Sequence, residues 1–277
     1  MITDEKIKKL QTIAKDVRVD IINMLVEAGS GHTAGSLGMA DVFTFLYFHI
    51  LRHKPDDPQW EDRDRLILSN GHIAPVLYAV MARAGYFPLE ELQTLRKFHS
   101  RLQGHPHKGY LPGIETSSGP LGSGLSQALG MALAESMINP YSDKFFYCLL
   151  GDGELNEGQN WEAFMHAGKE RIHNLIAIID RNDIQIDGYT HDVMPLEPLK
   201  EKFESFGWHT QEVNGHSFED LDQAINLAKN VNDMPSVIIA ITVPGRGVKE
   251  FERKPEWHGK APTKEEGEMA ISELTAN

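Results

Sequence analysis

Apolar runs alternate with helical stretches through the second half of the chain, and this alternation constrains the fold most strongly. Runs of strand length occupy residues 145–150, 175–179, 209–213 and 237–243. Stretches with helical periodicity lie between them, near residues 161–168, 198–206 and 218–229. Ser217 and Asp220 mark a typical start for the last of these helices. Strands that alternate with helices indicate a parallel sheet covered on both faces, so the sequence predicts an α/β fold with a parallel β-sheet.

The first half of the chain is mainly helical in pattern. Periodicity predicts helices near residues 6–28, 39–51, 73–84 and 125–138. A short strand that ends in a turn is predicted within "RDRLILSNGH", residues 63–72. Residues 100–124 are rich in glycine and proline and too long for an idle connection, which favours a functional loop. Because no repeat or linker divides the sequence, we predict a single domain over residues 1–277, with a short tail after about residue 262.

The composition excludes several classes of function. The 277 residues carry a formal net charge of −13, whereas a nucleic-acid-binding surface is basic. No apolar stretch approaches the roughly 20 residues that cross a bilayer, and the polar N-terminus shows no export signal. The one cysteine, Cys148, lies in an apolar run, which is typical of a core residue. These features predict a cytoplasmic protein that binds neither nucleic acid nor membrane.

An acidic turn follows the run at residues 145–150. "GDGELNEG", residues 151–158, places Asp152 between two glycines, and Asn182 follows the next apolar run. One helix separates these runs, so the strands are expected to be neighbours about 4.8 Å apart, with both side chains at one edge of the sheet. A carboxylate, an amide oxygen and a free carbonyl suit Mg²⁺ or Ca²⁺, with phosphate oxygens and water completing the shell. GDG alone indicates only a turn, and Asn182 makes the cation site the preferred interpretation.

Gly151-Asp152-Gly153, with Asn182 thirty positions after the aspartate, resembles the thiamine diphosphate motif. In proteins with that motif, the aspartate, the asparagine and a carbonyl two residues beyond the asparagine hold a divalent metal ion on the cofactor's diphosphate. The resemblance implies thiamine diphosphate as cofactor and Mg²⁺ as metal, with Ca²⁺ or Mn²⁺ as substitutes. The implied metal ligands are Asp152, Asn182 and the carbonyl of Ile184.

Five further segments resemble transketolase and occur in the same order. They are "SGHTAGSLGMAD" (30–41), "DRDRLILSNGH" (62–72), "GHP" (104–106), "TSSGPLGSGLSQALGMA" (116–132) and "WHGKAP" (257–262). The resemblance implies a transferase, EC 2.2.1.-, that moves a two-carbon ketol unit from a ketose phosphate to an aldose phosphate. Sugars of the pentose phosphate pathway of carbohydrate metabolism are the default substrates, although related split enzymes use branched or sulfonated sugars.

The same resemblance assigns roles to individual residues. The loop histidines would surround the reaction centre, bind substrate hydroxyls and move protons, because imidazole titrates near neutrality. They are His32, His72, His105 and His258. The implied cofactor-binding residues are His72, Gly119, Leu121, Gly151, Asp152, Gly153, Glu154, Asn182 and His258. Glu157 matches a glutamate in a carboxylate network across a subunit interface. Full-length transketolases usually read SGHPGAPLG, but this chain has Thr33, Ala34 and Ser36, which leaves the contacts of that loop open.

A full-length transketolase continues into a pyrimidine-binding domain and a C-terminal domain, and this sequence stops just past Pro262 with a tail. We interpret it as the N-terminal, diphosphate-binding subunit of a split transketolase; the alternative is a truncated piece of a full-length enzyme. The resemblance then implies a separate C-terminal subunit that carries the pyrimidine-binding domain. It also implies a homodimeric core within an α2β2 heterotetramer.

Other families share parts of this pattern. The α subunit of a 2-oxoacid dehydrogenase carries the diphosphate motif, but it is not expected to show "SGHTAGSLGMAD" or "WHGKAP". The segments "GHP" and "WHGKAP" disfavour an enzyme of the deoxyxylulose-phosphate synthase type. A nucleotide-binding oxidoreductase is disfavoured because "GPLGSGLSQ" lacks the third glycine of the dinucleotide fingerprint. A non-catalytic regulatory module would have no reason to keep the four histidines.

Overall fold

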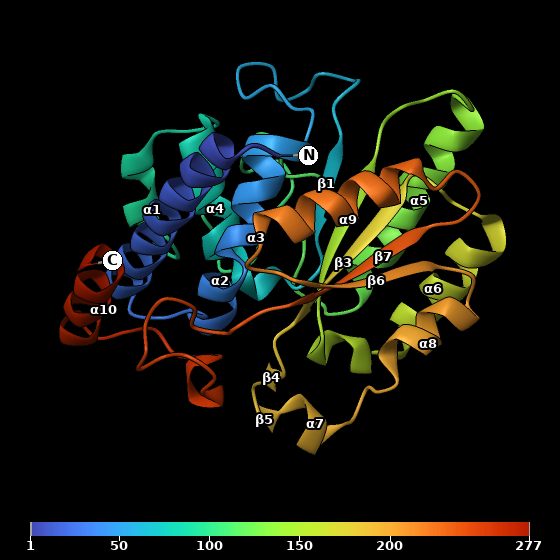
Figure 1. Cartoon of the computed structure of the whole chain (residues 1–277). Helices are drawn as coiled ribbons and strands as arrows, with labels where there is room; N and C mark the ends of the chain where they lie inside the picture. Colours follow the sequence, from blue (N-terminus) through green and yellow to red (C-terminus); the bar gives the residue numbers. More distant parts are fainter. Residues whose placement is uncertain (1, 277) are drawn as a thin grey trace.

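The computed structural model describes residues 2–276 and is built on a five-stranded parallel sheet (Figure 1). In spatial order its strands are β1 (Arg65–Leu68), β2 (Phe146–Gly151), β3 (Leu175–Arg181), β7 (Ser236–Ile241) and β6 (His209–Asn214). Each neighbouring pair is parallel. The predicted α/β class is therefore confirmed, and each strand predicted in the second half lies within about two residues of its observed bounds.

Helices cover both faces of the sheet. One layer contains α1 (Asp4–Ala28), α3 (Ala40–Phe45), α4 (Ala74–Ala84) and α9 (Phe218–Asn230); the other contains α5 (Ser123–Ile138), α6 (Gly158–Glu170) and α8 (Leu199–Ser205). Along β2, Tyr147 and Leu149 join the first core, whereas Phe146, Cys148 and Leu150 join the second. Because successive side chains point to opposite faces and both faces are buried, the strand reads as an unbroken apolar run.

Smaller elements surround this sandwich. They are α2 (Ala34–Gly38), a π-helical turn (Leu46–Ile50), the hairpin of β4 (Ile184–Gln185) and β5 (Gly188–Tyr189), α7 (Thr190–Val193) and α10 (Lys264–Ala276). The helix expected over residues 39–51 is therefore split between α3 and the π-helical turn. The tail after about residue 262 forms α10, which lies along α1 and buries Ala270 and Leu274 (Figure 1).

Capping residues determine where the first helix, α1, begins and ends. Thr3 accepts a hydrogen bond from the backbone N–H of Lys6 at the start of α1, and Gly29 ends the helix in the left-handed conformation, with φ of 62°. Glycine adopts this conformation without the steric cost that other residues meet. The turn sends the following loop, which carries His32, across the carboxyl ends of the strands. At α9, Ser217 accepts from the N–H of Asp220, as the sequence predicted.

A buried ion pair fixes α3 against α1. Arg18 on α1 donates to both carboxylate oxygens of Asp41 at 3.0 and 2.7 Å. His216 Nδ1 lies 2.7 Å from the same carboxylate, and its Nε2 accepts from the N–H of Val243. Arg18 and His216 hold the pKa of Asp41 well below its usual range, even though burial opposes them. Asp41 is therefore a structural residue that ties α1 and α3 to the loop after β6, and His216 in that loop contacts the loop after β7 in turn.

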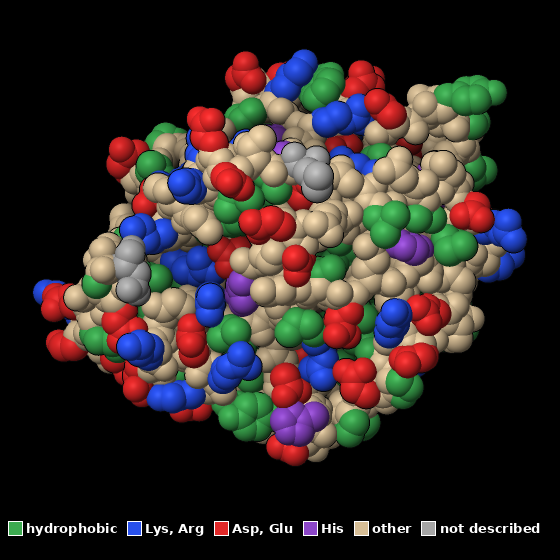
Figure 2. Space-filling model, viewed as in Figure 1, with side chains coloured by type: hydrophobic (Ala, Val, Ile, Leu, Met, Phe, Trp, Pro, Cys, Tyr) green, Lys and Arg blue, Asp and Glu red, His purple; other side chains and the backbone are tan. Residues whose placement is uncertain are grey.

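The surface carries charges of both signs. Figure 2 shows acidic and basic side chains interspersed over the visible face, with apolar side chains scattered among them. Within residues 2–276, no helix combines the length and the hydrophobicity that crossing a bilayer requires.

Candidate active site

A pocket of about 480 Å³ lies at the ends of β2 and β3. Gly151 on β2 pairs with Asp180 on β3, so Asp152 and Asn182 emerge at the same edge of the sheet, as expected. The residues singled out from the sequence that line it are His32, His72, His105, Gly119, Leu121, Gly151, Asp152, Gly153, Glu154, Asn182, Ile184 and His258. Glu157 is not among the lining residues. The fold thus brings seven separate segments of the chain to one cavity.

Asp152 is almost completely buried, with 1% of its surface exposed. Its Oδ1 accepts from the N–H of Gly153 at 2.7 Å, and its Oδ2 accepts from the N–H of Asp183 at 2.7 Å. Arg181 Nη1 donates to the same Oδ2 at 2.7 Å. Burial raises the pKa of Asp152, although the hydrogen bonds from Arg181 and Asp183 oppose that shift. The carboxylate is therefore held in place by its surroundings.

Asn182 is oriented by contacts on both ends of its amide. Its Nδ2 donates to Asp180 Oδ2 at 2.7 Å, and its Oδ1 accepts from the N–H of Ile184 at 3.0 Å. Asp180 is fully buried and also accepts from Thr242 Oγ1, and burial raises its pKa to about 7. Because Asp180 takes up the amide N–H, the amide oxygen of Asn182 is the atom left to serve as a ligand.

The residues at this edge fit a diphosphate held by a divalent cation. A carboxylate, an amide oxygen and a carbonyl form the mixed oxygen set that Mg²⁺ prefers. Within the described residues no group of three or more His, Cys, Asp or Glu side chains is placed to hold a metal ion, and the proposed set contains only one such side chain. Gly153 lets the side chain of Gln185 pack against this turn, since a Cβ there would lie 2.6 Å from Gln185 Oε1. Asn70, on the pocket wall, has a buried Oδ1 that finds no hydrogen-bond partner in the part of the chain that the structure describes.

Three histidine rings from distant loops meet beside these oxygens. The ring centroids of His32 and His72 are 4.9 Å apart, those of His72 and His258 are 5.1 Å apart, and those of His32 and His258 are 5.7 Å apart. His105 lines the same pocket, where a Cβ at Gly119 would lie 3.7 Å from its ring. His32 Nδ1 is buried and has no hydrogen-bond partner in the described chain. A residue that lines the cavity therefore carries a buried ring nitrogen that is free to form a hydrogen bond.

Burial keeps these rings neutral at physiological pH. It lowers the pKa of His32 to about 4, helped by the nearby His258 and Arg96. It also lowers the pKa of His72, where His258 and His32 add to the effect, and of His105 and His258. A neutral imidazole has one nitrogen that donates and one that accepts, so the cluster can exchange a proton with a bound hydroxyl or carbonyl oxygen.

The depressed pKa of His32 predicts that the protein loses stability in mild acid. The unfolded chain gains the proton near pH 6.5 and the folded chain only near pH 4. Neutral His32 therefore makes its full contribution to the unfolding free energy above about pH 6.5, and this contribution is lost as the pH falls toward 4. We expect His32 to account for about 2 kcal/mol of lost unfolding free energy at pH 5. Urea denaturation of the cofactor-free chain measures the unfolding free energy at pH 7 and at pH 5. Between these two pH values the unfolding free energy should fall less in His32→Asn than in the wild type. Equal falls would contradict the assignment of the low pKa to His32.

The two glutamates of the acidic turn have different surroundings. Glu154 is buried and accepts hydrogen bonds from Ser69 Oγ and from the N–H groups of Gly122 and Gly151. Its carboxylate thus faces the protein rather than a ligand. Glu157 is exposed at the start of α6. Its position is compatible with the expected interface, and it lies outside the pocket.

The residues that depart from the usual motif anchor the His32 loop. Thr33 Oγ1 donates to the carbonyl of Lys260 at 2.5 Å, which ties this loop to the segment that carries His258. Ser36 Oγ donates to the carbonyl of His32 at 2.8 Å. Both side chains are buried. The substitutions therefore support the position of His32 by hydrogen bonds that the sequence pattern did not reveal.

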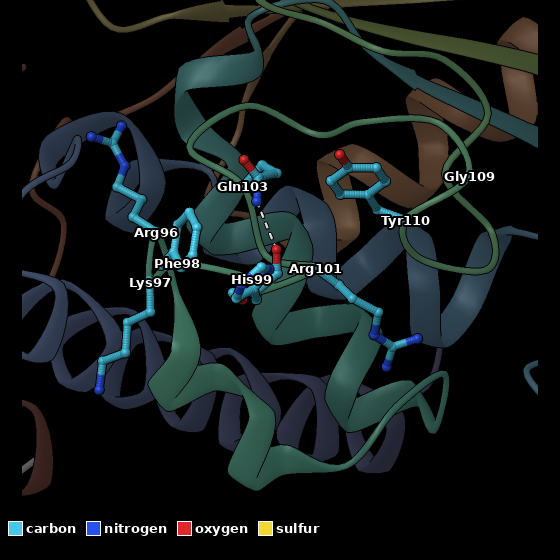
Figure 3. A pocket seen from close by; sticks show the side chains of 9 residues that line it. Arg96, Lys97, Phe98, His99, Arg101, Gln103, Gly109 and Tyr110 are labelled. Carbon is cyan, nitrogen blue, oxygen red and sulfur yellow. Dashed lines mark hydrogen bonds between the residues drawn. The ribbon is translucent and has the colours of Figure 1, made fainter.

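A larger cavity of about 760 Å³ lies on the surface near residues 96–110 (Figure 3). Two of its cations are paired with acids outside it: Lys97 with Glu27, and Arg101 with Glu91. Phe98 is 89% exposed, and Gln103 donates to the carbonyl of Ser100. Because this cavity has no convergent set of catalytic groups, the smaller pocket at the strand ends is the better candidate active site.

Comparison with known proteins decides the family. The model of the "Transketolase, thiamine diphosphate binding domain" family matches residues 9–275. The chain belongs to the transketolase family. A 6-deoxy-6-sulfo-D-fructose transketolase subunit of Clostridium sp. (strain MSTE9) is 42% identical over 96% of this chain and 96% of its own length. An apulose-4-phosphate transketolase subunit of Phocaeicola vulgatus is 38% identical over 98% of this chain and 95% of its own length.

Solved transketolases share the fold. The transketolase of Leishmania mexicana superposes with a TM-score of 0.90 and 32% identity, and that of Campylobacter jejuni with a TM-score of 0.90 and 35% identity. This chain is covered to 96% in both comparisons, but it spans only 41% and 42% of those chains. The predictions of a transketolase fold, a thiamine diphosphate-binding domain and a transferase of this family are confirmed. Since relatives of matching length are subunits, the predicted N-terminal subunit of a split transketolase is confirmed as well.

Proposed function

We propose that the pocket at the ends of β2 and β3 binds the diphosphate of thiamine diphosphate through Mg²⁺ and completes a ketol-transfer site with a partner subunit. One observation carries this proposal. Asp152, Asn182 and Ile184 line the same cavity as His32, His72, His105 and His258. A hard-oxygen cation site beside a cluster of neutral imidazoles is the arrangement that ketol transfer requires from this half of the enzyme.

The metal ligands are proposed to be Asp152 through its carboxylate, Asn182 through Oδ1 and Ile184 through its carbonyl, with Ca²⁺ or Mn²⁺ as substitutes for Mg²⁺. The cofactor would lie along Gly119, Leu121, Gly151 and Gly153, with Glu154, His72 and His258 as further neighbours. When bound, thiamine diphosphate supplies the nucleophilic carbon and the electron sink for breaking a carbon–carbon bond. The protein supplies its position and the local charge.

The histidines act on the sugar. Neutral imidazole N–H groups donate to the carbonyl and hydroxyl oxygens of the ketose, where negative charge develops as the bond to the ketol unit forms and breaks. The acceptor nitrogens take up the hydroxyl proton that is released when the donor sugar is cleaved, and they return it to the acceptor aldose. The close packing of His32, His72 and His258 lets one substrate oxygen contact more than one ring.

The remaining assignments belong to the same proposal. The partner is a C-terminal subunit that carries the pyrimidine-binding domain, and two copies of this chain form the core of an α2β2 assembly, with Glu157 at the interface. Residues 1–277 act as a single domain, and the acidic composition supports a cytoplasmic location. The substrates are anionic sugars: pentose phosphates are the default, while the names of the two relatives point to a sulfonated ketose or apulose 4-phosphate.

Cofactor retention tests the metal assignment. The chain, assembled with its partner subunit, is dialysed against thiamine diphosphate with Mg²⁺ or with excess EDTA. We expect bound cofactor in Mg²⁺, loss in EDTA, and recovery when Mg²⁺, Mn²⁺ or Ca²⁺ is restored. Equal retention in EDTA would contradict a metal-bridged diphosphate.

A further inference from the structure

The carboxylate of Glu154 joins three segments that form the pocket. Its Oε1 accepts from Ser69 Oγ at 2.5 Å and from the N–H of Gly122 at 2.7 Å, and its Oε2 accepts from the N–H of Gly151 at 3.1 Å. Ser69 follows β1, Gly122 precedes α5 and Gly151 ends β2. Only 3% of the Glu154 surface is exposed. A single buried side chain thus connects the ends of two strands with the start of a helix.

Ser69 extends this connection into α5. Its hydroxyl accepts from the N–H of Gly124 at 3.0 Å while it donates to Glu154. The helix start lies directly against Ser69, because a Cβ at Gly124 would lie 2.4 Å from Ser69 Cβ. The first N–H groups of a helix have no partner within the helix, so this pair satisfies donors that would otherwise be buried unpaired. The start of α5 is therefore held by Glu154 both directly and through Ser69.

The segment that Glu154 holds leads into the cofactor pocket. Gly119 and Leu121 line the cavity and immediately precede Gly122, and Asp152 immediately follows Gly151. The Glu154 carboxylate therefore sets the distance between the glycine loop before α5 and the metal-binding turn after β2. The three groups that donate to it are a hydroxyl and two backbone N–H groups, and none of them belongs to a lysine or an arginine.

We propose that Glu154 is a positioning residue that holds the glycine loop against the metal-binding turn, so that the pocket is preformed before the cofactor enters. The inference rests on the proposed function in one respect, namely that thiamine diphosphate binds between these two segments. An ionised carboxylate only accepts hydrogen bonds, which is what three converging donors require. Glutamine at this position would turn an NH₂ group toward one of these donors.

Amide hydrogen exchange tests the positioning role of Glu154 without any cofactor. In the cofactor-free chain, Glu154→Gln is expected to speed exchange at Gly122, Gly124 and Gly151 by about 10-fold or more, since a buried donor that is left unpaired favours local opening. Exchange in α9, on the opposite face, should stay unchanged. Glu201→Gln on the exposed surface of α8 is the matched control and should behave as the wild type throughout. Unchanged exchange at the three glycines would overturn the proposal.

Kinetics of the assembled enzyme separate positioning from general destabilisation. Glu154→Gln is expected to raise the thiamine diphosphate concentration for half-maximal activity by about 10-fold, while kcat at saturating cofactor stays within a few-fold of the wild-type value. A fall in kcat with an unchanged cofactor requirement would overturn the proposal. If the wild-type assembly itself binds no thiamine diphosphate, the proposed function fails, whereas the exchange result still decides the role of Glu154.

Ser69→Ala keeps the test decisive if the glutamate variant folds poorly. It removes one of the three donors and should give a smaller shift in the same two measurements. In the double variant Glu154→Gln, Ser69→Ala, the effects should be smaller than the product of the single effects, because both changes break one network. Independent, fully multiplicative effects would contradict a single hydrogen-bond network that contains both Glu154 and Ser69.

Discussion

Replacing Asp152 by alanine is expected to abolish Mg²⁺-dependent binding of thiamine diphosphate and ketol transfer with it. Asp152 is the one charged ligand in the proposed set, and its carboxylate is buried and pre-positioned. Even the residues that merely support metal ligands contribute about 10–100-fold to affinity, so loss of the ligand itself should cost more than about 100-fold. Cofactor titration of the assembled enzyme, in Mg²⁺ and in EDTA, measures the effect.

Two controls make that result specific. Removal of the Asp152 side chain also leaves the N–H of Asp183 without its acceptor and takes away one of the carboxylates that pair with Arg181, so unfolding must be measured in parallel. Asp152→Asn keeps the shape and loses the charge, and it should show the same loss of cofactor with a smaller loss of stability. Asp192→Ala, at an exposed position on α7, should leave binding unchanged. Full activity in Asp152→Ala would show that the metal assignment is wrong.

Replacing His32 by alanine is expected to lower kcat by about 100- to 10,000-fold, the usual contribution of general acid–base catalysis. The ring packs between His72 and His258, and its Nδ1 is buried with no hydrogen-bond partner among residues 2–276. In the proposed function this ring contacts the reacting sugar rather than the diphosphate. Single-turnover kinetics with saturating cofactor should show the loss in the chemical step, while the affinity for thiamine diphosphate changes by only a few-fold.

His209→Ala provides the comparison. His209 lies on β6 and is partly buried, and burial lowers its pKa too, but it does not line the pocket. Its replacement should leave kcat unchanged. If His32→Ala instead lost cofactor affinity and kept kcat, the ring would serve cofactor binding and its proposed role in proton transfer would be wrong.

The layer structure and the edge of the sheet that carries the proposed metal ligands were predictable from the sequence because both depend on local patterns. The apolar runs follow from strands buried on both faces, and the helix between them makes β2 and β3 neighbours. Once those strands pair, the position of Asp152 beside the segment of Asn182 follows from their register. The edge of the sheet at which Asp152 and Asn182 lie could therefore be predicted without knowledge of contacts between distant segments.

Contacts between distant segments were beyond what periodicity and spacing reveal. His32, His72 and His258 meet because three unrelated loops end at one edge of the sheet, and only the family resemblance suggested their convergence. The role of Thr33 became visible only through its bond to Lys260, 227 positions away. Glu154 belongs to the same acidic turn as Asp152, yet its side chain faces into the protein, a direction that the sequence does not specify.

Reconstitution of ketol transfer from separate chains decides whether the site is shared with a partner. This chain, the product of the neighbouring open reading frame, and an equimolar mixture of the two are each assayed with thiamine diphosphate, Mg²⁺ and a ketose phosphate with an aldose phosphate. We expect the two chains to co-purify and only the mixture to transfer the two-carbon unit. Full transfer by this chain alone would contradict a site that a second polypeptide completes.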